Sequence, residues 1–137
     1  MITTGEWDRI NGLSAGILKC AFRVHTELGP GLLESIYQKC LAIEFTRQNL
    51  GYECEKPVFV KYGGVQLTEV AYRFDFVVED LVIIELKAVD EVKDLHKRQL
   101  MTYLRLGHKP LGLLLNFNVI RLKTGIARII NHTVPSQ

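Results

Sequence analysis

The segment at residues 81–87 constrains the fold more than any other part of the sequence. It reads Leu-Val-Ile-Ile-Glu-Leu-Lys and is apolar at every position until Glu85. A strand that is apolar on both faces is typical of the centre of a covered sheet. Glu85 and Lys87 are two residues apart, so they point to the same face. A buried charge is costly without a partner or a metal ion. The sequence therefore predicts a central strand with a polar site at its end.

Two helices are expected before this strand and one after it. Apolar residues at helical spacing indicate helices at 6–28 and about 32–49, separated by the break Gly29-Pro30-Gly31. A third helical pattern covers 91–107 and ends at Gly107. The second helix is expected to bury the apolar residues Leu33, Ile36, Tyr37, Leu41 and Phe45.

Strand patterns fill the remaining chain. Alternating residues indicate strands near 58–62 and over 65–78, joined by a turn at Gly63-Gly64. A fully apolar strand follows at 111–117, and a last strand or strand pair covers about 118–130. Together with the helices, this order predicts an α/β (α+β) fold with a mixed central sheet. We expect one domain over residues 1–137, with its core at about 8–130.

The strand at 65–78 carries a second carboxylate that is relevant to Glu85. Strict alternation places Val70, Tyr72, Phe74, Phe76 and Val78 on one face, and Arg73, Asp75 and Val77 on the other. If Val78 pairs with Leu81 across a two-residue loop, Asp75 lies opposite Ile84, on the wrong face. If Val78 pairs with Val82 across a three-residue loop, Asp75 lies opposite Glu85. A functional site thus requires a three-residue loop at 79–81 or a bulge near Asp75.

With that geometry, Asp75 and Glu85 form a hard oxygen site suited to Mg²⁺ or Mn²⁺. A bound metal would polarise a phosphate oxygen and lower the pKa of a water molecule. Lys87 would hold that water or stabilise charge on the phosphate. The alternative is a structural salt-bridge cluster with Lys87 and Arg73. A second Glu-x-Lys pattern, Glu91-Val92-Lys93, is interpreted as a solvated helix start.

Composition and cysteine spacing bear on the cellular compartment in which the protein is expected. The chain has 137 residues, a net charge of +2 and three widely spaced cysteines. These cysteines suggest neither a disulfide framework nor a zinc site, which favours a reducing, cytoplasmic compartment. No apolar run reaches the roughly 20 residues that a membrane helix needs. His25 and His96 are interpreted as structural residues because they lack the spacing of metal ligands.

Several motifs together resemble the GxxExxY protein family. Gly31-Leu32-Leu33-Glu34-Ser35-Ile36-Tyr37 matches the motif that names this family. Tyr72-Arg73-Phe74-Asp75 and Glu85-Leu86-Lys87-Ala88-Val89 resemble its central hairpin, and residues 99–104 and 112–117 resemble its last helix and strand. The resemblance covers about residues 8–130. It implies the PD-(D/E)xK nuclease-like superfamily, a restriction-endonuclease-like core and a relation to RecB-like nuclease domains. No proline precedes Asp75, a departure shared by many members.

The resemblance also implies further site residues. Glu34 would join Asp75 and Glu85 as a metal ligand, although a carboxylate near a helix N-terminus also favours the helix dipole. Gln99 and Tyr103 share one helix face and would lie beside the metal, unless they form only an amphipathic boundary. Tyr37 is expected in the core, and Gly31 is expected to serve backbone geometry.

The leading functional hypothesis is a Mg²⁺-dependent (or Mn²⁺-dependent) nuclease that hydrolyses phosphodiester bonds of DNA, in preference to RNA. The alternative is a non-catalytic nucleic-acid-binding or protein-interaction module on a nuclease scaffold. A homodimer or a protein partner would supply specificity in either case. No membrane association is expected.

Overall fold

The computed structural model describes residues 1–69 and 72–135. Two helices come first, α1 (Thr4–Leu28) and α2 (Glu34–Arg47). Five strands and a third helix, α3 (Asp94–Gly107), follow before the last strands. The strands and the short 3-10 helix are β1 (Tyr52–Val58), β2 (Lys61–Tyr62), β3 (Val65–Gln66), β4 (Tyr72–Val78), β5 (Val82–Lys87), β6 (Leu111–Asn116), η1 (Leu122–Gly125) and β7 (Ile126–Ile130).

Five of these strands form one mixed sheet in the order β1-β4-β5-β6-β7. Strands β5 and β6 are parallel and are joined through α3, whereas every other neighbouring pair is antiparallel. The central strand is β5, as the doubly apolar segment at 81–87 predicts. The α+β class, with an antiparallel hairpin inside a mixed sheet, is confirmed, and the architecture is consistent with a restriction-endonuclease-like core.

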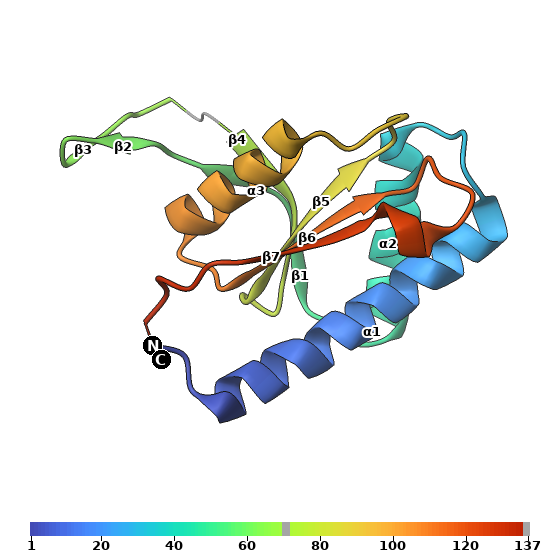
Figure 1. Cartoon of the computed structure of the whole chain (residues 1–137), viewed down its shortest axis with the longest axis horizontal. Coiled ribbons are helices and arrows are strands. Elements are labelled where there is room, and N and C mark those ends of the chain that lie inside the picture. Colours follow the sequence, from blue (N-terminus) through green and yellow to red (C-terminus); the bar gives the residue numbers. More distant parts are fainter. Residues whose placement is uncertain (70–71, 136–137) are drawn as a thin grey trace.

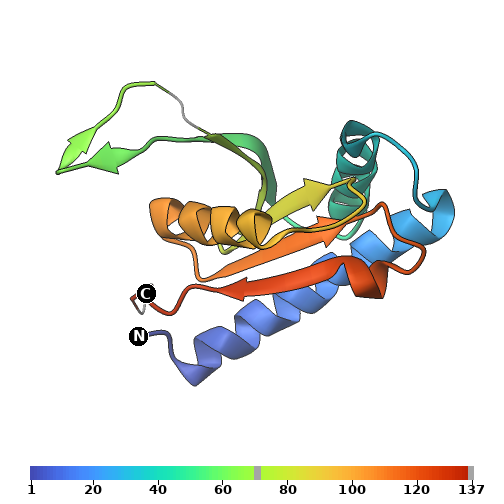
Figure 2. The same ribbon diagram turned by 45° about the horizontal axis from the view of Figure 1, so that its top comes forward.

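The sheet separates two apolar cores (Figure 1). Helices α1 and α2 pack on one face, where Ile17, Leu41 and Phe76 are fully buried. Helix α3 packs on the other face through Leu100 and Leu104. Figure 2 shows the same layers from a second angle, with α3 and α1 on opposite sides of the sheet. Strand β5 contributes Ile84 to the first core and Ile83 to the second, which explains its continuous apolar sequence.

The start of α2 differs from the prediction. Tyr37, Leu41 and Phe45 are buried as expected, but Leu33 is 74% exposed and Ile36 also reaches solvent. Leu33 is the N-cap residue of α2 and so lies outside the helical periodicity. The three buried residues are spaced by four along one line of the helix, and Ile36 flanks that line. The prediction that Leu33 and Ile36 are buried was wrong.

Two strand predictions also need correction. Strand β1 begins at Tyr52, earlier than the strand predicted near 58–62. It is an edge strand with solvent on most of its surface, so its residues lack the apolar alternation that would have revealed it. The long strand predicted at 65–78 is divided into β3 and β4. Val70, which was expected on one face of that strand, lies outside the described residues.

A projecting arm, residues 59–69, connects β1 to β4 and contains the β2-β3 hairpin. Figures 1 and 2 both show this hairpin standing away from the five-stranded sheet. Residues 61–69 of the arm are all exposed. A two-stranded hairpin without an apolar core is only marginally stable in water. The arm therefore presents surface rather than contributing to the core.

The helices offer no membrane span. Among residues 1–69 and 72–135, no helix combines the length and apolar character that crossing a bilayer requires.

Candidate active site

The turn between β4 and β5 has the length that a site requires. Val78 pairs with Val82, and Phe76 pairs with Ile84. The intervening loop therefore has three residues, as predicted. Glu79 and Asp80 both adopt left-handed backbone conformations, with φ of 51° and 55°. Leu81 N donates to Val78 O at 3.0 Å and closes the turn.

An ion pair holds this turn from outside. Lys109 Nζ lies 2.6 Å from Asp80 Oδ1. The hydrogen bond from Lys109 lowers the pKa of Asp80. The turn that sets the strand register is thus attached to the loop after α3.

Asp75 and Glu85 meet at the point where the β4-β5 ladder ends. Asp75 N donates to Glu85 Oε1 at 3.3 Å, and Leu86 N donates to Asp75 Oδ2 at 2.7 Å. Each carboxylate thus accepts a backbone N–H from the opposite strand, beyond the last paired residues Phe76 and Ile84. The strand-parity prediction that Asp75 meets Glu85 is confirmed.

The side-chain alternation of β4 breaks at Asp75. Phe76 packs in the core under α1 and α2, whereas Phe74 packs in the core under α3. Strict alternation had placed both on one face, so that part of the prediction was wrong. Across the β1-β4 pair, Glu55 has a φ of 52° and interrupts the regular strand. The change of faces coincides with the loss of the regular ladder, which leaves Asp75 directed at the backbone of β5.

Burial makes it unfavourable for both carboxyl groups to be ionised at the same time. Glu85 is only 7% exposed and Asp75 is half-buried. Loss of solvation, followed by the charge of Asp75, raises the pKa of Glu85 to about 9. Burial also raises the pKa of Asp75, although the hydrogen bond from Leu86 N opposes this change. Without a cation, Glu85 therefore holds its proton more tightly than a solvated glutamate does.

Lys87 lies near the carboxylates without forming an ion pair with them. Its charge opposes the rise in the pKa of Asp75, Glu85 and Glu34. Yet none of the ion pairs formed by residues 1–69 and 72–135 includes Asp75, Glu85 or Lys87. Arg73 instead donates to the backbone oxygen of Glu55 at 3.4 Å. A salt-bridge cluster does not account for these residues.

The Gly-x-x-Glu-x-x-Tyr motif places Glu34 at the first position of α2. Gly31 has a φ of 99°, which a glycine adopts without strain. The hydroxyl of Tyr37 donates to Gly29 O at 2.6 Å and accepts from Leu32 N at 3.2 Å, so it ties the loop to the helix. The ring of Tyr37 is buried and stacks on Phe117 with centroids 4.6 Å apart. Tyr37 and Gly31 are thus structural, as expected.

Glu34 belongs to the electrostatic neighbourhood of the site. Burial raises the pKa of Glu34, the charge of Asp75 adds to this rise, and the charge of Lys87 opposes it. Its side chain nevertheless remains exposed and forms no hydrogen bond with another described residue. Its role as a metal ligand stays a prediction.

The two predicted residues of α3 differ in their surroundings. Tyr103 is buried, and its ring centroid lies 5.0 Å from that of Tyr72. Burial, then the charge of Glu85, raises the pKa of Tyr103 to about 12. Gln99 lies one turn earlier with an exposed side chain, and it forms no hydrogen bond within the described part of the chain. Its placement beside a metal stays a prediction.

Glu55 and Gln38 are additional residues of this site that the sequence did not reveal. The charge of Glu55 contributes to the raised pKa of both Asp75 and Glu34. Gln38 Nε2 donates to Glu55 Oε1 at 2.9 Å and to the backbone oxygen of Asp75 at 3.5 Å. Gln38 follows Glu34 by one helical turn, and this spacing is the only sequence signal that could have indicated it.

Asn116 supports the segment that follows Lys87. Its side chain is buried and exchanges hydrogen bonds with the backbone of Val89, at 3.1 Å to Val89 N and 2.9 Å to Val89 O. It also pairs with Lys87 across the parallel β5-β6 ladder. The end of the central strand is therefore fixed by a neighbour that sequence reasoning did not single out.

The histidines have the structural roles that were expected. His25 is buried, with Nε2 2.8 Å from Val119 O. His96 Nδ1 accepts from Lys93 N at 3.0 Å at the start of α3. Lys93 is the N-cap residue of α3, so the second Glu-x-Lys pattern does mark a helix start.

The donor atoms of the site fit a divalent cation in part. Asp75 and Glu85 supply the hard oxygens that Mg²⁺ and Mn²⁺ prefer, and no cationic side chain in the described part of the chain forms an ion pair with them. However, no three His, Cys, Asp or Glu side chains of residues 1–69 and 72–135 converge on one point. The described residues thus bring two carboxylates together, and a third donor would require a change in side-chain position or a water molecule.

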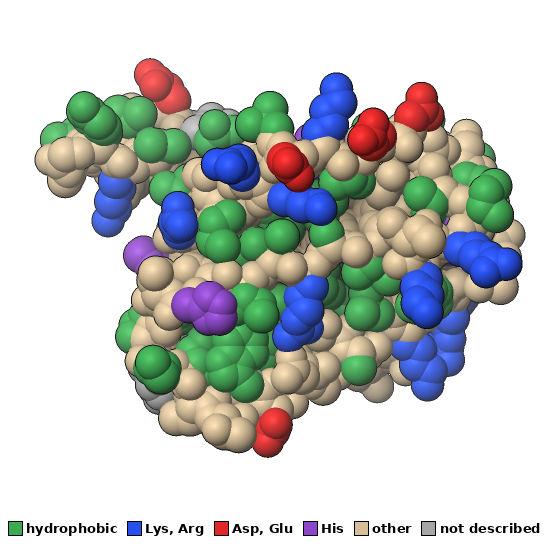
Figure 3. Space-filling view, in the orientation of Figure 1, with side chains coloured by type: hydrophobic (Ala, Val, Ile, Leu, Met, Phe, Trp, Pro, Cys, Tyr) green, Lys and Arg blue, Asp and Glu red, His purple; other side chains and the backbone are tan. Residues whose placement is uncertain are grey.

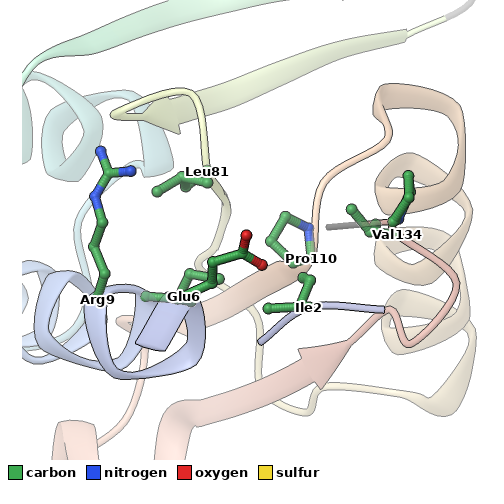
Figure 4. Close-up of a pocket in the computed structure, with 8 residues that line it drawn as sticks. Ile2, Glu6, Arg9, Leu81, Pro110 and Val134 are labelled. Atoms are coloured by element: carbon green, nitrogen blue, oxygen red, sulfur yellow. The ribbon is translucent and has the colours of Figure 1, made fainter. Parts of the chain in front are cut away.

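A small pocket elsewhere in the molecule is unrelated to this site. Figure 4 shows Ile2, Glu6 and Arg9 of the N-terminal region facing Leu81, Pro110 and Val134. The cavity measures about 30 Å³, which is about the volume of one water molecule. Glu6 belongs to a capping box with Thr3 at the start of α1. The N-terminal region thus meets the β4-β5 turn, Pro110 and the C-terminal region around this pocket.

Comparison with known proteins agrees with this geometry. The model of the PD-(D/E)XK nuclease superfamily matches residues 11–129, which include the larger part of α1, all of α2, the carboxylate hairpin and all but the last residue of β7. No curated protein and no solved structure matches the chain. The family model covers most of the sequence and includes Asp75, Glu85 and Lys87. The chain therefore belongs to the PD-(D/E)XK nuclease superfamily.

Proposed function

We propose that this protein is a metal-dependent nuclease that hydrolyses phosphodiester bonds in nucleic acid. The observation that carries the proposal is the meeting of Asp75 and Glu85 beside Lys87, with neither carboxylate in an ion pair with any described residue. Placing a buried and a half-buried carboxylate together without a cationic partner costs free energy. Binding of a divalent cation at this site would offset the cost of burying the carboxylates, and membership in a nuclease superfamily supports that interpretation.

The proposed metal ligands are Asp75 and Glu85, with Glu34 joining through a side-chain rotation or a water molecule. We propose Mg²⁺, with Mn²⁺ as a substitute, because both ions favour carboxylate oxygens. When bound, the ion would polarise a phosphate oxygen and make a bound water molecule more acidic.

The chain itself would position the reacting groups. Leu86 N–H holds Asp75 Oδ2 at 2.7 Å, so this carboxylate is oriented before any ligand arrives. Lys87 shares the face of Glu85 and would stabilise negative charge on the phosphate. Gln99 and Tyr103 of α3 would border the substrate. We propose DNA in preference to RNA as the substrate.

A non-catalytic nucleic-acid-binding module is the second candidate. The observation that favours it is that no third ligand converges with Asp75 and Glu85 among the described residues. In such a module, the carboxylate pair would be a remnant of the superfamily scaffold.

A cleavage assay with matched variants distinguishes the two candidates. Purified protein is incubated with Mg²⁺ or Mn²⁺ and labelled DNA or RNA. We expect Asp75→Ala and Lys87→Ala to lower the cleavage rate by about 10³-fold, because each removes a group needed in the transition state. Lys93→Ala, in the second Glu-x-Lys pattern, is the control and should retain activity.

Two outcomes would count against the nuclease. Cleavage that persists in Asp75→Ala and Lys87→Ala would indicate a contaminating enzyme. The absence of cleavage in the unaltered protein, together with intact nucleic-acid binding, would favour the module.

A further inference from the structure

A basic groove lies between the projecting arm and the C-terminal end of α3. It measures about 300 Å³. Lysine and histidine side chains line it from both sides, and no Asp or Glu is among its lining residues. The cationic or titratable residues of the lining are Lys56, Lys61, His108 and Lys109. Figure 3 shows blue and purple side chains gathered beneath the arm, where the surface is hollowed.

The lysines of this groove differ in how far they are neutralised. Lys109 pairs with Asp80 at 2.6 Å, and Lys56 pairs with Glu53 at 3.5 Å. Lys61 forms no ion pair with any residue in the described ranges. It lies in β2, on the exposed arm, and faces the groove with its charge uncompensated. The groove is thus complementary to an anion, and Lys61 is its free charge.

Aromatic rings connect this groove to the candidate active site. Phe74 lines the groove, and its ring centroid lies 5.7 Å from that of Tyr103. Tyr103 in turn contacts Tyr72 and interacts electrostatically with Glu85 and Asp75. Phe74 and Tyr103 are both buried, so this link runs beneath the surface, and it makes the groove and the carboxylates neighbours on the α3 side of the sheet.

Exposed aromatic rings lie in the groove and beside the candidate active site. Tyr72 is 39% exposed beside Tyr103, whereas Tyr62 of the arm follows Lys61 in β2 and so points away from the groove. Phe59 lines the groove and is also exposed. Proteins that bind single-stranded nucleic acid combine a basic groove with aromatic rings on which unpaired bases stack. A duplex cannot offer the faces of its paired bases in this way.

We infer that the arm and the end of α3 bind single-stranded nucleic acid and lead it to Asp75 and Glu85. This inference rests on the proposed nuclease function, whose substrate it narrows to unpaired strands. The phosphate backbone contacts Lys61, with Lys56 and Lys109 beside it. Bases stack on Phe59 in the groove and on Tyr72 beside the candidate active site.

A binding measurement without metal tests the groove separately from catalysis. A fluorescein-labelled oligothymidylate of about 12 nucleotides matches the strand lengths that such grooves bind. Its fluorescence anisotropy is followed in EDTA, with a duplex of equal length as the comparison. We expect tighter binding of the single strand.

Two substitutions on the arm probe the two kinds of contact. Lys61→Glu should weaken binding several-fold and reduce the salt dependence by the contribution of about one phosphate, a change of roughly 0.7 in the logarithmic slope. Phe59→Ala should weaken binding by roughly 5-fold or more through the loss of one stacked base. Both residues are exposed, so the fold should not change. Lys123→Glu and Ile120→Ala alter exposed residues outside the groove and should bind like the unaltered protein.

Three results would overturn the inference. These are equal or tighter binding of the duplex, unchanged binding in both arm variants, and no binding of the single strand at low salt. A failed cleavage assay with intact single-strand binding would instead overturn only the nuclease function.

Discussion

At the scale of single residues, the burial of Glu85 strongly disfavours the ionised form of its carboxyl group. Its carboxyl is buried beside Asp75, and its pKa is raised to about 9 from an ordinary value of 4.5. The folded state therefore binds its proton more tightly than the unfolded state does. Between these two pH values, folding takes up a proton, so stability falls as the pH rises. Low pH therefore stabilises the folded protein in the absence of metal, and a bound cation would take the place of the proton.

This fall in stability with rising pH gives a prediction for the Glu85→Gln variant in metal-free protein. Glutamine cannot ionise, so the variant should avoid the loss of stability that the unaltered protein shows as the pH rises above 4.5. At pH 8 we expect the variant to be more stable by at least about 1 kcal/mol, or about 4 °C in Tm. The gain should vanish near pH 4. Thermal unfolding in EDTA across this range measures it.

Glu91→Gln is the control for this prediction, because Glu91 is exposed at the start of the α3 region. It should change Tm little at any pH. A Glu85→Gln variant that is less stable than the unaltered protein at pH 8 would show that the ionised form is the one that the fold stabilises.

The sequence anticipated the main pair of residues but missed their neighbours. Asp75 and Glu85 could be paired because strand parity is a matter of counting, and only the turn length was open. Glu55 could not be found in this way, since its place in the site depends on a left-handed backbone in an edge strand. Such an irregularity leaves no periodic pattern in the sequence.

At the scale of elements, the loop before α2 is held by one hydroxyl group. Tyr37 Oη bonds to Gly29 O and Leu32 N, which fixes the approach of the chain to Glu34. The phenyl ring alone would still stack on Phe117. The hydroxyl thus affects the loop, and the ring affects the core.

We therefore predict that Tyr37→Phe costs about 1–2 kcal/mol of unfolding free energy, through two lost hydrogen bonds without a cavity. Urea denaturation measures this change. Tyr52→Phe is the matched control, because its hydroxyl makes only a long, exposed contact of 3.4 Å with Thr46, and it should cost much less. Equal costs for the two variants would contradict the role assigned to the hydroxyl of Tyr37.

Prediction of the elements succeeded where one face of an element is buried and failed elsewhere. The central strand, α1 and the end of α3 at Gly107 follow from apolar periodicity. Strand β1 was missed because its first six residues are not buried. Leu33 and Ile36 were misplaced because apolar character was taken as burial, whereas the start of α2 leaves both in contact with solvent.

At the scale of the whole molecule, the two cores share one sheet. Strand β5 supplies buried residues to both faces, so loss of this strand would disrupt both cores. The candidate metal ligands lie on β4 and β5, inside this unit. Any ligand that binds them should stabilise the whole molecule rather than one part.

Metal addition should therefore move a single thermal transition. At a Mn²⁺ concentration 100 times the Kd, the stabilisation is about 2.7 kcal/mol, which corresponds to about 9 °C in Tm. Scanning calorimetry with Mn²⁺ and then with excess EDTA should show the shift and its reversal. Asp75→Ala should show neither. An equal shift in that variant would place the metal at another site.

The three-residue turn at 79–81 has a consequence for recognising active relatives. The site depends on a count of residues as well as on their identities, because one residue fewer would direct Asp75 away from Glu85. A chain can thus keep the Asp, the Glu and the Lys, match the superfamily over its whole length, and still lack an assembled site. In chains without a bulge beside the first carboxylate, the spacing between the two carboxylates therefore predicts from sequence alone whether their side chains can meet.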